Sequence, residues 1–454
     1  MSETTVSEAY ALVIHFNDLR TKDHRPLAAA CESFQTVYAM VVLDPQSYQG
    51  QVFGHARMSA RRMAWYLAAL EDLRQTYRSQ GGDLVIRVGK PHEHVALVAK
   101  ELGVSAIFGQ QAKNYEEIEV RNDIEAAVPH VPCQWVYNDV LIDPEDLPTP
   151  ATSFPRSFTG FRKKVEARCT VPRPLESTYQ IACPNMDTGS MPTLASLGLA
   201  SQPIDVRSPI ANLQGGESGA WSQIEQYIWA GNHLKSYKET RNGMLGWSDS
   251  SKLSPYLALG LISPRSVYHQ VIEYEKDRIE NQSTYWLKFE LLWREYFHAL
   301  GLFCGTKLFL TTGVRERSMS WSRDLELFER WKTGQTGCPI VDACMRELAN
   351  TGYSSNRARQ ISASFLVRYL GIDWRWGAAW FEHHLIDYDP CSNWGNWQYL
   401  AGVGTDSRDR VFGMRRQAEQ YDGHTEFVKR WIPEFIDHEP ETILRLNPTH
   451  PDDG

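Results

Sequence analysis

Apolar runs alternate with helix-like stretches over the first third of the chain. Each run is short, apolar and rich in β-branched residues, which is typical of buried strands. The runs span residues 11–16, 36–43, 84–88, 104–108 and 134–137. Helical spacing fills residues 56–80 and 92–102 between them. Strands that alternate with helices predict a doubly wound parallel sheet, so we expect an α/β domain over residues 1–143.

The pattern changes twice after this domain. Pro, Ser and Gly are frequent in residues 144–215 and no period is clear, which predicts a long linker. Within it, residues 156–164 are basic and aromatic together, a pattern that fits either a solvated helix start or a functional surface. From residue 216 onward, apolar positions recur every three or four residues, as in 283–300, 339–349, 356–370 and 377–385. Residues 216–454 therefore predict an all-α domain.

Charge and cysteine usage narrow the class of protein. The 454 residues carry a formal charge of −8, which argues against a nucleic-acid coat and leaves room for one local basic face. The eight cysteines form no CxxC pair, which favours free thiols over a zinc or iron–sulfur site. No stretch reaches the roughly 18 apolar residues of a membrane span. We expect a cytoplasmic monomer that does not contact membranes.

The usual phosphate-binding loops are absent from the α/β part of the sequence. No GxGxxG follows the first apolar run, and residues 82–90 have the wrong spacing for a P-loop. In the helical part, residues 237–241 and 248–254 supply hydroxyls, one Lys and backbone amides before a Pro-containing helix start. That pattern suits either a pyrophosphate cradle or a plain capped helix.

A second polar group lies further along the helical part. Asn356 and Arg359 are three apart on one helix, so they share a face. Asp387, Asp389 and Asn393 follow a later helix. An Arg with a carboxylate and an amide could satisfy the edge of a polar heteroaromatic ring, or it could be an ion pair that stabilises the fold.

Other catalytic patterns are weak. His383 and Asp387 are four apart, but no third ligand has sensible spacing, so we expect no metal site. No GxSxG elbow occurs and no cysteine has a clear His partner, so a hydrolase has no support. Nine of the fifteen tryptophans lie between residues 286 and 397. They could pack a core, line a planar ligand or serve as oxidisable side chains.

Six segments of the helical part carry a specific likeness, namely residues 290–297, 336–343, 345–348, 355–367, 372–375 and 393–399. Together they resemble the photolyase/cryptochrome family. Residues 158–164, 237–242, 250–254 and 399–404 are similar to the DASH cryptochromes, mostly described as photolyases that prefer single strands. The resemblance implies an α/β domain, a long linker and a helical FAD-binding domain.

The activity that this resemblance implies is light-driven repair of cyclobutane pyrimidine dimers, preferably in single-stranded DNA, by an electron from excited reduced FAD. The alternative is a blue-light photoreceptor that signals through protein partners.

The resemblance also implies where a U-shaped FAD would bind. Its phosphate and ribitol side would be held by Tyr237, Ser250, Ser251, Lys252, Leu253, Ser254 and Arg294. Its isoalloxazine and the neighbouring groups would be lined by Asn356, Arg359, Asp387, Asp389 and Asn393, with Asn393 facing flavin N5.

For the substrate, the resemblance assigns a pocket beside the flavin. Glu290 would hydrogen-bond the dimer, most effectively as the protonated acid, while Trp293 and Tyr399 would form facing walls. The other DNA-contacting positions would be Arg241, Arg357, Gln360 and Arg410. Tyr399 replaces the Trp of double-strand photolyases, so part of a stacking contribution of about 1–3 kcal/mol per base would be lost. Because flipping a base out of a duplex costs a few kcal/mol, this predicts action on single strands.

The family's electron relay to an oxidised flavin would be Trp321, Trp374 and Trp397, and Trp374→Phe is expected to slow photoreduction. Three positions depart from the family pattern. Tyr369 replaces an Asp, Trp286 is out of register with the usual flavin-pocket Trp, and Ala112 replaces a Glu that helps to bind a folate antenna. A methenyltetrahydrofolate antenna therefore stays open but disfavoured.

Overall fold

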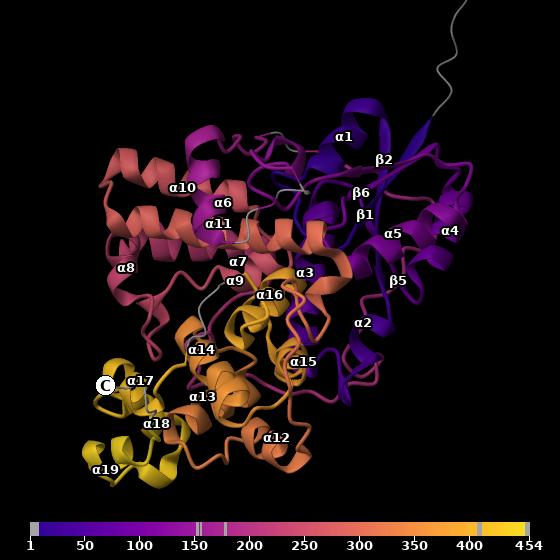
Figure 1. The fold of residues 1–454 in the computed structure, drawn as a ribbon. Helices are drawn as coiled ribbons and strands as arrows, with labels where there is room; N and C mark the ends of the chain where they lie inside the picture. The colour runs from indigo at the N-terminus through magenta and orange to yellow at the C-terminus, as the bar shows by residue number, and fades with distance from the viewer. Residues whose placement is uncertain (1–8, 151–153, 155–156, 177–178, 406–410, 450–454) are drawn as a thin grey trace, which may run out of the picture.

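A parallel five-stranded sheet organises the N-terminal domain (Figure 1). The structure is a computed structural model that describes residues 9–150, 154, 157–176, 179–405 and 411–449. The strands are β1 (Tyr10–His15), β2 (Thr36–Leu43), β5 (Leu84–Val88), β6 (Ala106–Gln110) and β7 (Cys133–Val136). Their order is β5-β2-β1-β6-β7 and every neighbouring pair is parallel. The predicted doubly wound sheet is confirmed.

Helices cover both faces of this sheet. They are α1 (Arg25–Ser33), α2 (Gln46–Gln49), α3 (Ala60–Ser79), α4 (Pro91–Leu102) and α5 (Tyr115–Ala127). Along β1, Val13 joins the core that holds α1 and α3, while Leu12 and Ile14 join the core of α4 and α5. This alternation explains why the strands are nearly continuous apolar runs, since both of their faces are buried.

The helix expected from residue 56 begins later. A short hairpin, β3 (Gln51–Val52) and β4 (His55–Ala56), precedes it, and Gly54 at its tip has a φ of +80°. Ser59 then caps α3 by accepting the Arg62 amide. The start of this helix is therefore set by two features. The first is a turn that requires a residue in the left-handed conformation, and the second is the Ser59 hydroxyl cap.

The linker contains a docked helix, α6 (Phe158–Arg168). Ser157 caps it by accepting the Gly160 amide at 3.2 Å. Phe158 and Phe161 are buried, and both rings contact Tyr296. The interpretation of this segment as a solvated helix start is therefore wrong, because its apolar face is packed against the helical domain.

Helices make up the rest of the described chain. They are α7 (Gly216–Ile224), α8 (Tyr237–Thr240), α9 (Ser254–Ala258), α10 (Pro264–Asp277), α11 (Gln282–Cys304), α12 (Leu325–Lys332), α13 (Pro339–Thr351), α14 (Asn356–Ser364), α15 (Trp374–His384), α16 (Pro390–Ala401), α17 (Met414–Tyr421), α18 (Glu426–Trp431) and α19 (Pro440–Arg445). The expected all-α part is confirmed. The helix predicted to reach residue 370 widens into a π-helical turn at Phe365–Tyr369. No described helix combines the length and apolarity that crossing a bilayer requires.

Helix α11 joins the two parts of the molecule. Its Glu295 accepts the backbone amides of Leu141 at 2.8 Å and Ile142 at 3.1 Å, just after the α/β domain. Its neighbour Arg294 pairs with Asp139, which also pairs with Lys113 at 2.9 Å. Buried hydrogen bonds of this kind fix the orientation of α11 relative to the sheet.

One His/Asp group stands out in the described part of the α/β domain, formed by His15, Asp18 and His24. His24 accepts the Leu27 amide at Nδ1, and its Nε2 lies 2.9 Å from Asp18 Oδ2. His15 contacts the Tyr77 hydroxyl at 2.8 Å through its Nε2. These contacts cap α1 and hold the turn after β1.

We expect Glu295→Ala to lower the free energy of unfolding by about 2–5 kcal/mol, because it leaves two buried N–H donors without an acceptor. Urea denaturation of the purified protein measures this. Glu295→Gln retains one acceptor oxygen and should lose less. A change below about 1 kcal/mol for the Ala variant would contradict this role.

Candidate functional site

A cavity of about 870 Å³ opens between α6, α11, α14 and α16. Six of the seven positions predicted to contact DNA line it, namely Arg241, Glu290, Trp293, Arg357, Gln360 and Tyr399. The seventh, Arg410, lies outside the described residues. The helical period explains this convergence on α11, since Glu290, Trp293 and Phe297 occupy one face of the helix. The structure therefore brings the predicted substrate residues together.

Glu290 is held at the wall of this cavity by two donors. It pairs with Arg241 at 2.5 Å and accepts from the Trp286 indole N–H at 3.1 Å. Burial raises the pKa of Glu290 above its ordinary value, although Arg241 and Trp286 act in the opposite direction. Trp286 also lines the cavity, a role that the sequence analysis missed. Its spacing of four residues from Glu290 on one helix is the signal that could have indicated it.

Aromatic rings form one side of the cavity. Phe158 from the linker helix stacks on Trp293 with ring centroids 3.7 Å apart and planes 13° apart. Tyr399 meets Trp293 edge to face, with centroids 6.4 Å apart and planes 82° apart. Phe289 completes this side and meets Phe158 at 88°. The contribution of Phe158 could not be found from local pattern, because it depends on how the linker docks.

A smaller pocket of about 90 Å³ adjoins the large cavity. All five residues predicted for the isoalloxazine line it, namely Asn356, Arg359, Asp387, Asp389 and Asn393. The two cavities share the lining residues Asn356, Gln360, Asn396 and Tyr399. The predicted cofactor residues and the predicted substrate residues therefore line adjoining cavities and meet at these shared side chains.

A buried ion pair dominates the smaller pocket. Arg359 pairs with Asp387 at 2.7 Å and also donates to the Ser354 carbonyl at 2.8 Å. The other carboxylate oxygen of Asp387, Oδ1, is buried without a hydrogen-bond partner among the described residues. A buried acceptor of this kind requires a donor from a ligand or from water.

Asp389 anchors the helix at the other side of this pocket. It caps α16 by accepting the Ser392 amide at 2.6 Å and contacts His298 at 3.0 Å. Burial opposes its ionisation, but His298 and nearby cations lower the pKa of Asp389 overall. Asn393, one turn into α16, donates its amide to the Ala378 carbonyl at 3.0 Å.

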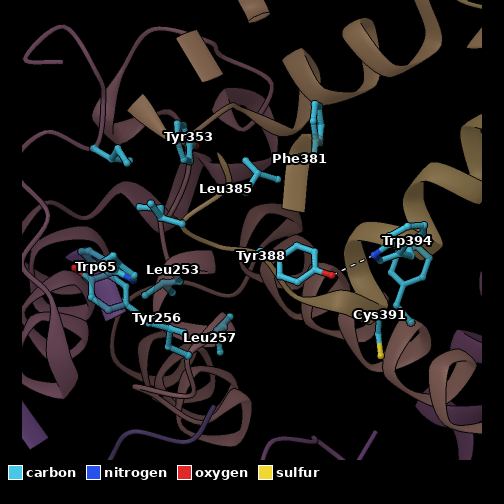
Figure 2. Packing of buried hydrophobic residues seen from close by; sticks show 14 of the residues in the cluster. Trp65, Leu253, Tyr256, Leu257, Tyr353, Phe381, Leu385, Tyr388, Cys391 and Trp394 are labelled. Carbon is cyan, nitrogen blue, oxygen red and sulfur yellow. Dashed lines mark hydrogen bonds between the residues drawn. The ribbon is translucent and has the colours of Figure 1, made fainter. Parts of the chain in front are cut away.

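Five of the residues predicted for the phosphate side form the turn 250–254 at the start of α9, where Ser250, Ser251, Lys252 and Leu253 precede the helix and Ser254 is its first residue. Lys252 is buried with a φ of +51° and donates to Ser250 Oγ at 2.9 Å. Its ammonium lies 5.4 Å from the Tyr353 ring, and the Arg359 guanidinium lies 6.0 Å from the same ring. Figure 2 shows Tyr353 and Leu253 in this part of the core. The turn 250–254 and the Arg359–Asp387 pair therefore both lie next to Tyr353.

The turn residues line neither cavity, and neither do the two further residues predicted for the phosphate side. Tyr237 begins α8 and is buried, which raises its pKa well above the ordinary value. Arg294 pairs with Asp139 and donates to the Leu257 carbonyl at 3.2 Å. The structure thus places Arg294 at the contact between the two domains.

The three tryptophans predicted to form the electron relay differ in their surroundings. Trp397 lines the smaller pocket, Trp374 is fully buried and Trp321 is partly buried. Trp374 meets Trp394, with ring centroids 5.7 Å apart, and Trp394 donates to the Tyr388 hydroxyl at 3.1 Å (Figure 2). Within the described part of the chain, no ring contact joins the three predicted members directly. Their electron relay stays a prediction.

Comparison with known proteins identifies the family. The family models "DNA photolyase" and "FAD binding domain of DNA photolyase" match residues 11–179 and 286–452. The cryptochrome DASH proteins of Natronomonas pharaonis and Gloeobacter violaceus are each 44% identical to the chain. The matches cover 95% of this chain and 92% of the first relative, and 97% of this chain and 90% of the second. The chain belongs to the photolyase/cryptochrome family.

Solved structures agree with this assignment. The cryptochrome of Synechocystis sp. gives a TM-score of 0.92 at 38% identity, over 96% of this chain and 91% of that one. A class III photolyase from Agrobacterium tumefaciens gives a TM-score of 0.85 at 27% identity, over 98% and 90% of the two chains.

The chain therefore has an FAD-binding domain, and the polar groups of the smaller pocket suit part of that cofactor. The buried Asp387 oxygen offers an acceptor, while Asn393 and Arg359 supply further polar groups around the same pocket. A pocket of about 90 Å³ is smaller than typical ligand sites of roughly 300–1,000 Å³, so a flavin also requires the adjoining space.

We expect Asp387→Asn to weaken FAD binding by about ten- to hundredfold, because a hydrogen bond to a charged group contributes about 1.5–3 kcal/mol. Titration of the apoprotein with FAD measures this. Asp373→Asn is the matched control, since Asp373 pairs with Arg375 at the same 2.7 Å and lines neither cavity. Equal affinities for the two variants would contradict the assignment of Asp387.

Proposed function

We propose that this protein repairs cyclobutane pyrimidine dimers in DNA in a light-dependent reaction, with a preference for single strands. The observation that carries the proposal is the shared wall between the two cavities. Four side chains line both the pocket of the Arg359–Asp387 pair and the cavity of Glu290 and Trp293. A cofactor in one and a damaged base in the other would be close enough for direct electron transfer.

Bound reduced FAD would supply light absorption and the transferred electron. The residues proposed to hold it are the turn 250–254, Arg359, Asp387 and Asn393, together with Tyr237 at the start of α8. No general acid or base is needed to break bonds in such a reaction, so the protein's part is binding, orientation and electrostatics.

Glu290 is proposed to hydrogen-bond the flipped dimer. A protonated carboxyl can donate to a base carbonyl, whereas a carboxylate can only accept. Burial favours the protonated form and Arg241 opposes it, so displacement of Arg241 toward a DNA phosphate would favour protonation. Arg241 and Arg357 would supply the local basic face on an acidic protein.

The relatives support this proposal at the level of the family. The matched solved structures include a photolyase as well as a cryptochrome, and the matched curated proteins are cryptochrome DASH proteins. Tyr399 lies at the cavity edge beside Trp293, which supports weaker stacking than a Trp would give.

We expect the FAD-loaded, reduced and illuminated protein to repair a thymine dimer faster in a single-stranded oligonucleotide than in the matching duplex. Tyr399→Trp should narrow this difference, since a larger ring gives more stacking for a flipped base. Dimer loss is followed by chromatography, with dark samples as the control. Equal rates on both substrates would refute the strand preference, and no dimer loss in light would favour the photoreceptor alternative.

The repair rate should fall as pH rises through the raised pKa of Glu290, because the proposed donor is then lost. Glu290→Gln retains a donor at all pH values, so its repair rate should not show this fall. Arg241→Ala removes a positive charge that lowers the pKa of Glu290, so the fall in rate should move to higher pH. Repair rates measured from pH 5 to 9 test this, and an unchanged fall in the Gln variant would exclude Glu290 as its cause.

A further inference from the structure

The linker helix α6 contributes a wall of the proposed substrate cavity, and Phe158 is the buried α6 residue that lines it. Phe158 is the first residue of α6 and is 6% exposed. Its ring lies between two aromatic neighbours on α11, with its plane parallel to Trp293 and the edge of Phe289 against it. A side chain this buried is part of the wall.

The contact with Trp293 covers part of one face of the indole. A centroid separation of 3.7 Å is close to the contact distance of two carbon atoms, so the Phe158 ring lies directly against the ring system of Trp293. Phe297 also stacks on Trp293 with a larger offset, with centroids 5.5 Å apart and planes 27° apart. Trp293 also lines the cavity, so part of the indole that these two rings leave uncovered faces it.

Helix α6 is held in place independently of Phe158. Arg162 bonds the Tyr285 hydroxyl, which in turn donates to Glu166 at 2.7 Å, and the Arg162 guanidinium lies 5.4 Å from the Phe289 ring. Phe161, one turn after Phe158, packs on Tyr296 with centroids 5.3 Å apart. A change at Phe158 should therefore leave the helix docked.

We infer that Phe158 is a positioning residue of the substrate site. It fixes the plane of Trp293 so that a single flat face of the indole is presented to an unstacked pyrimidine dimer. This inference rests on the proposed function, and it assigns to the linker a part in distinguishing a damaged base from an undamaged strand. Aromatic pairs stabilise each other beyond the area that they bury, so a flat partner matters as well as a filled space.

The test is dark binding of the FAD-loaded protein to two single-stranded oligonucleotides that differ only in one thymine dimer. The ratio of the two affinities is the readout, and it requires no photochemistry. Phe158→Leu keeps most of the volume and removes the flat ring, so this ratio should fall about two- to tenfold. The affinity for the undamaged strand should stay the same, because phosphate contacts dominate it.

Phe161→Leu is the matched control, since it makes the same change on the same helix in a buried position that does not line the cavity. It should lower stability to a similar extent and leave the ratio unchanged, and Phe158→Tyr should restore the ratio. If the wild-type protein binds both strands equally, the proposed function fails. If the wild type discriminates and Phe158→Leu discriminates equally well or better, the proposed function stands and the role of Phe158 is refuted.

Discussion

Helices α14 and α16 supply a set of side chains that lines two adjoining cavities, and this shared lining brings the proposed cofactor and substrate sites next to each other. It consists of Asn356, Gln360, Asn396 and Tyr399. On one side lies the Arg359–Asp387 pair, and on the other lies Glu290 with Trp293. Electron transfer between two bound molecules requires that both be held close and in fixed orientation. The rest of the fold serves to hold these two helices against α11.

Helix α11 contributes to this arrangement because one of its faces lines the large cavity and another binds the α/β domain. One face points Glu290 and Trp293 into the large cavity, while Arg294 and Glu295 bind the end of the α/β domain. A site built on a long helix with buried polar anchors is more rigid than one built on loops. The linker helix packs Phe158 on Trp293, so the linker and the helical domain both line the large cavity.

The fold could be predicted well from the sequence, but only part of the candidate site could. Continuous apolar runs predicted the parallel strands, because both faces of this sheet are buried. The hairpin before α3 and the π-helical turn at Phe365 were missed, since both depend on local backbone geometry. Arg359 and Asp387 are 28 residues apart, so their spacing could not show that they form an ion pair, and the family resemblance only placed both of them at the isoalloxazine. Phe158 was missed because tertiary packing decides what it contacts, whereas the helical spacing of Trp286 from Glu290 could have indicated its place.

The central claim is that flavin and damaged base bind side by side, in adjoining cavities that share four lining side chains. An experimental structure of the FAD-loaded protein with a dimer-containing single-stranded oligonucleotide tests it most directly. The account predicts the flavin against the Arg359–Asp387 pair and the flipped dimer against Glu290 and Trp293. A dimer bound outside the large cavity, or a flavin bound on the α/β domain alone, would contradict it.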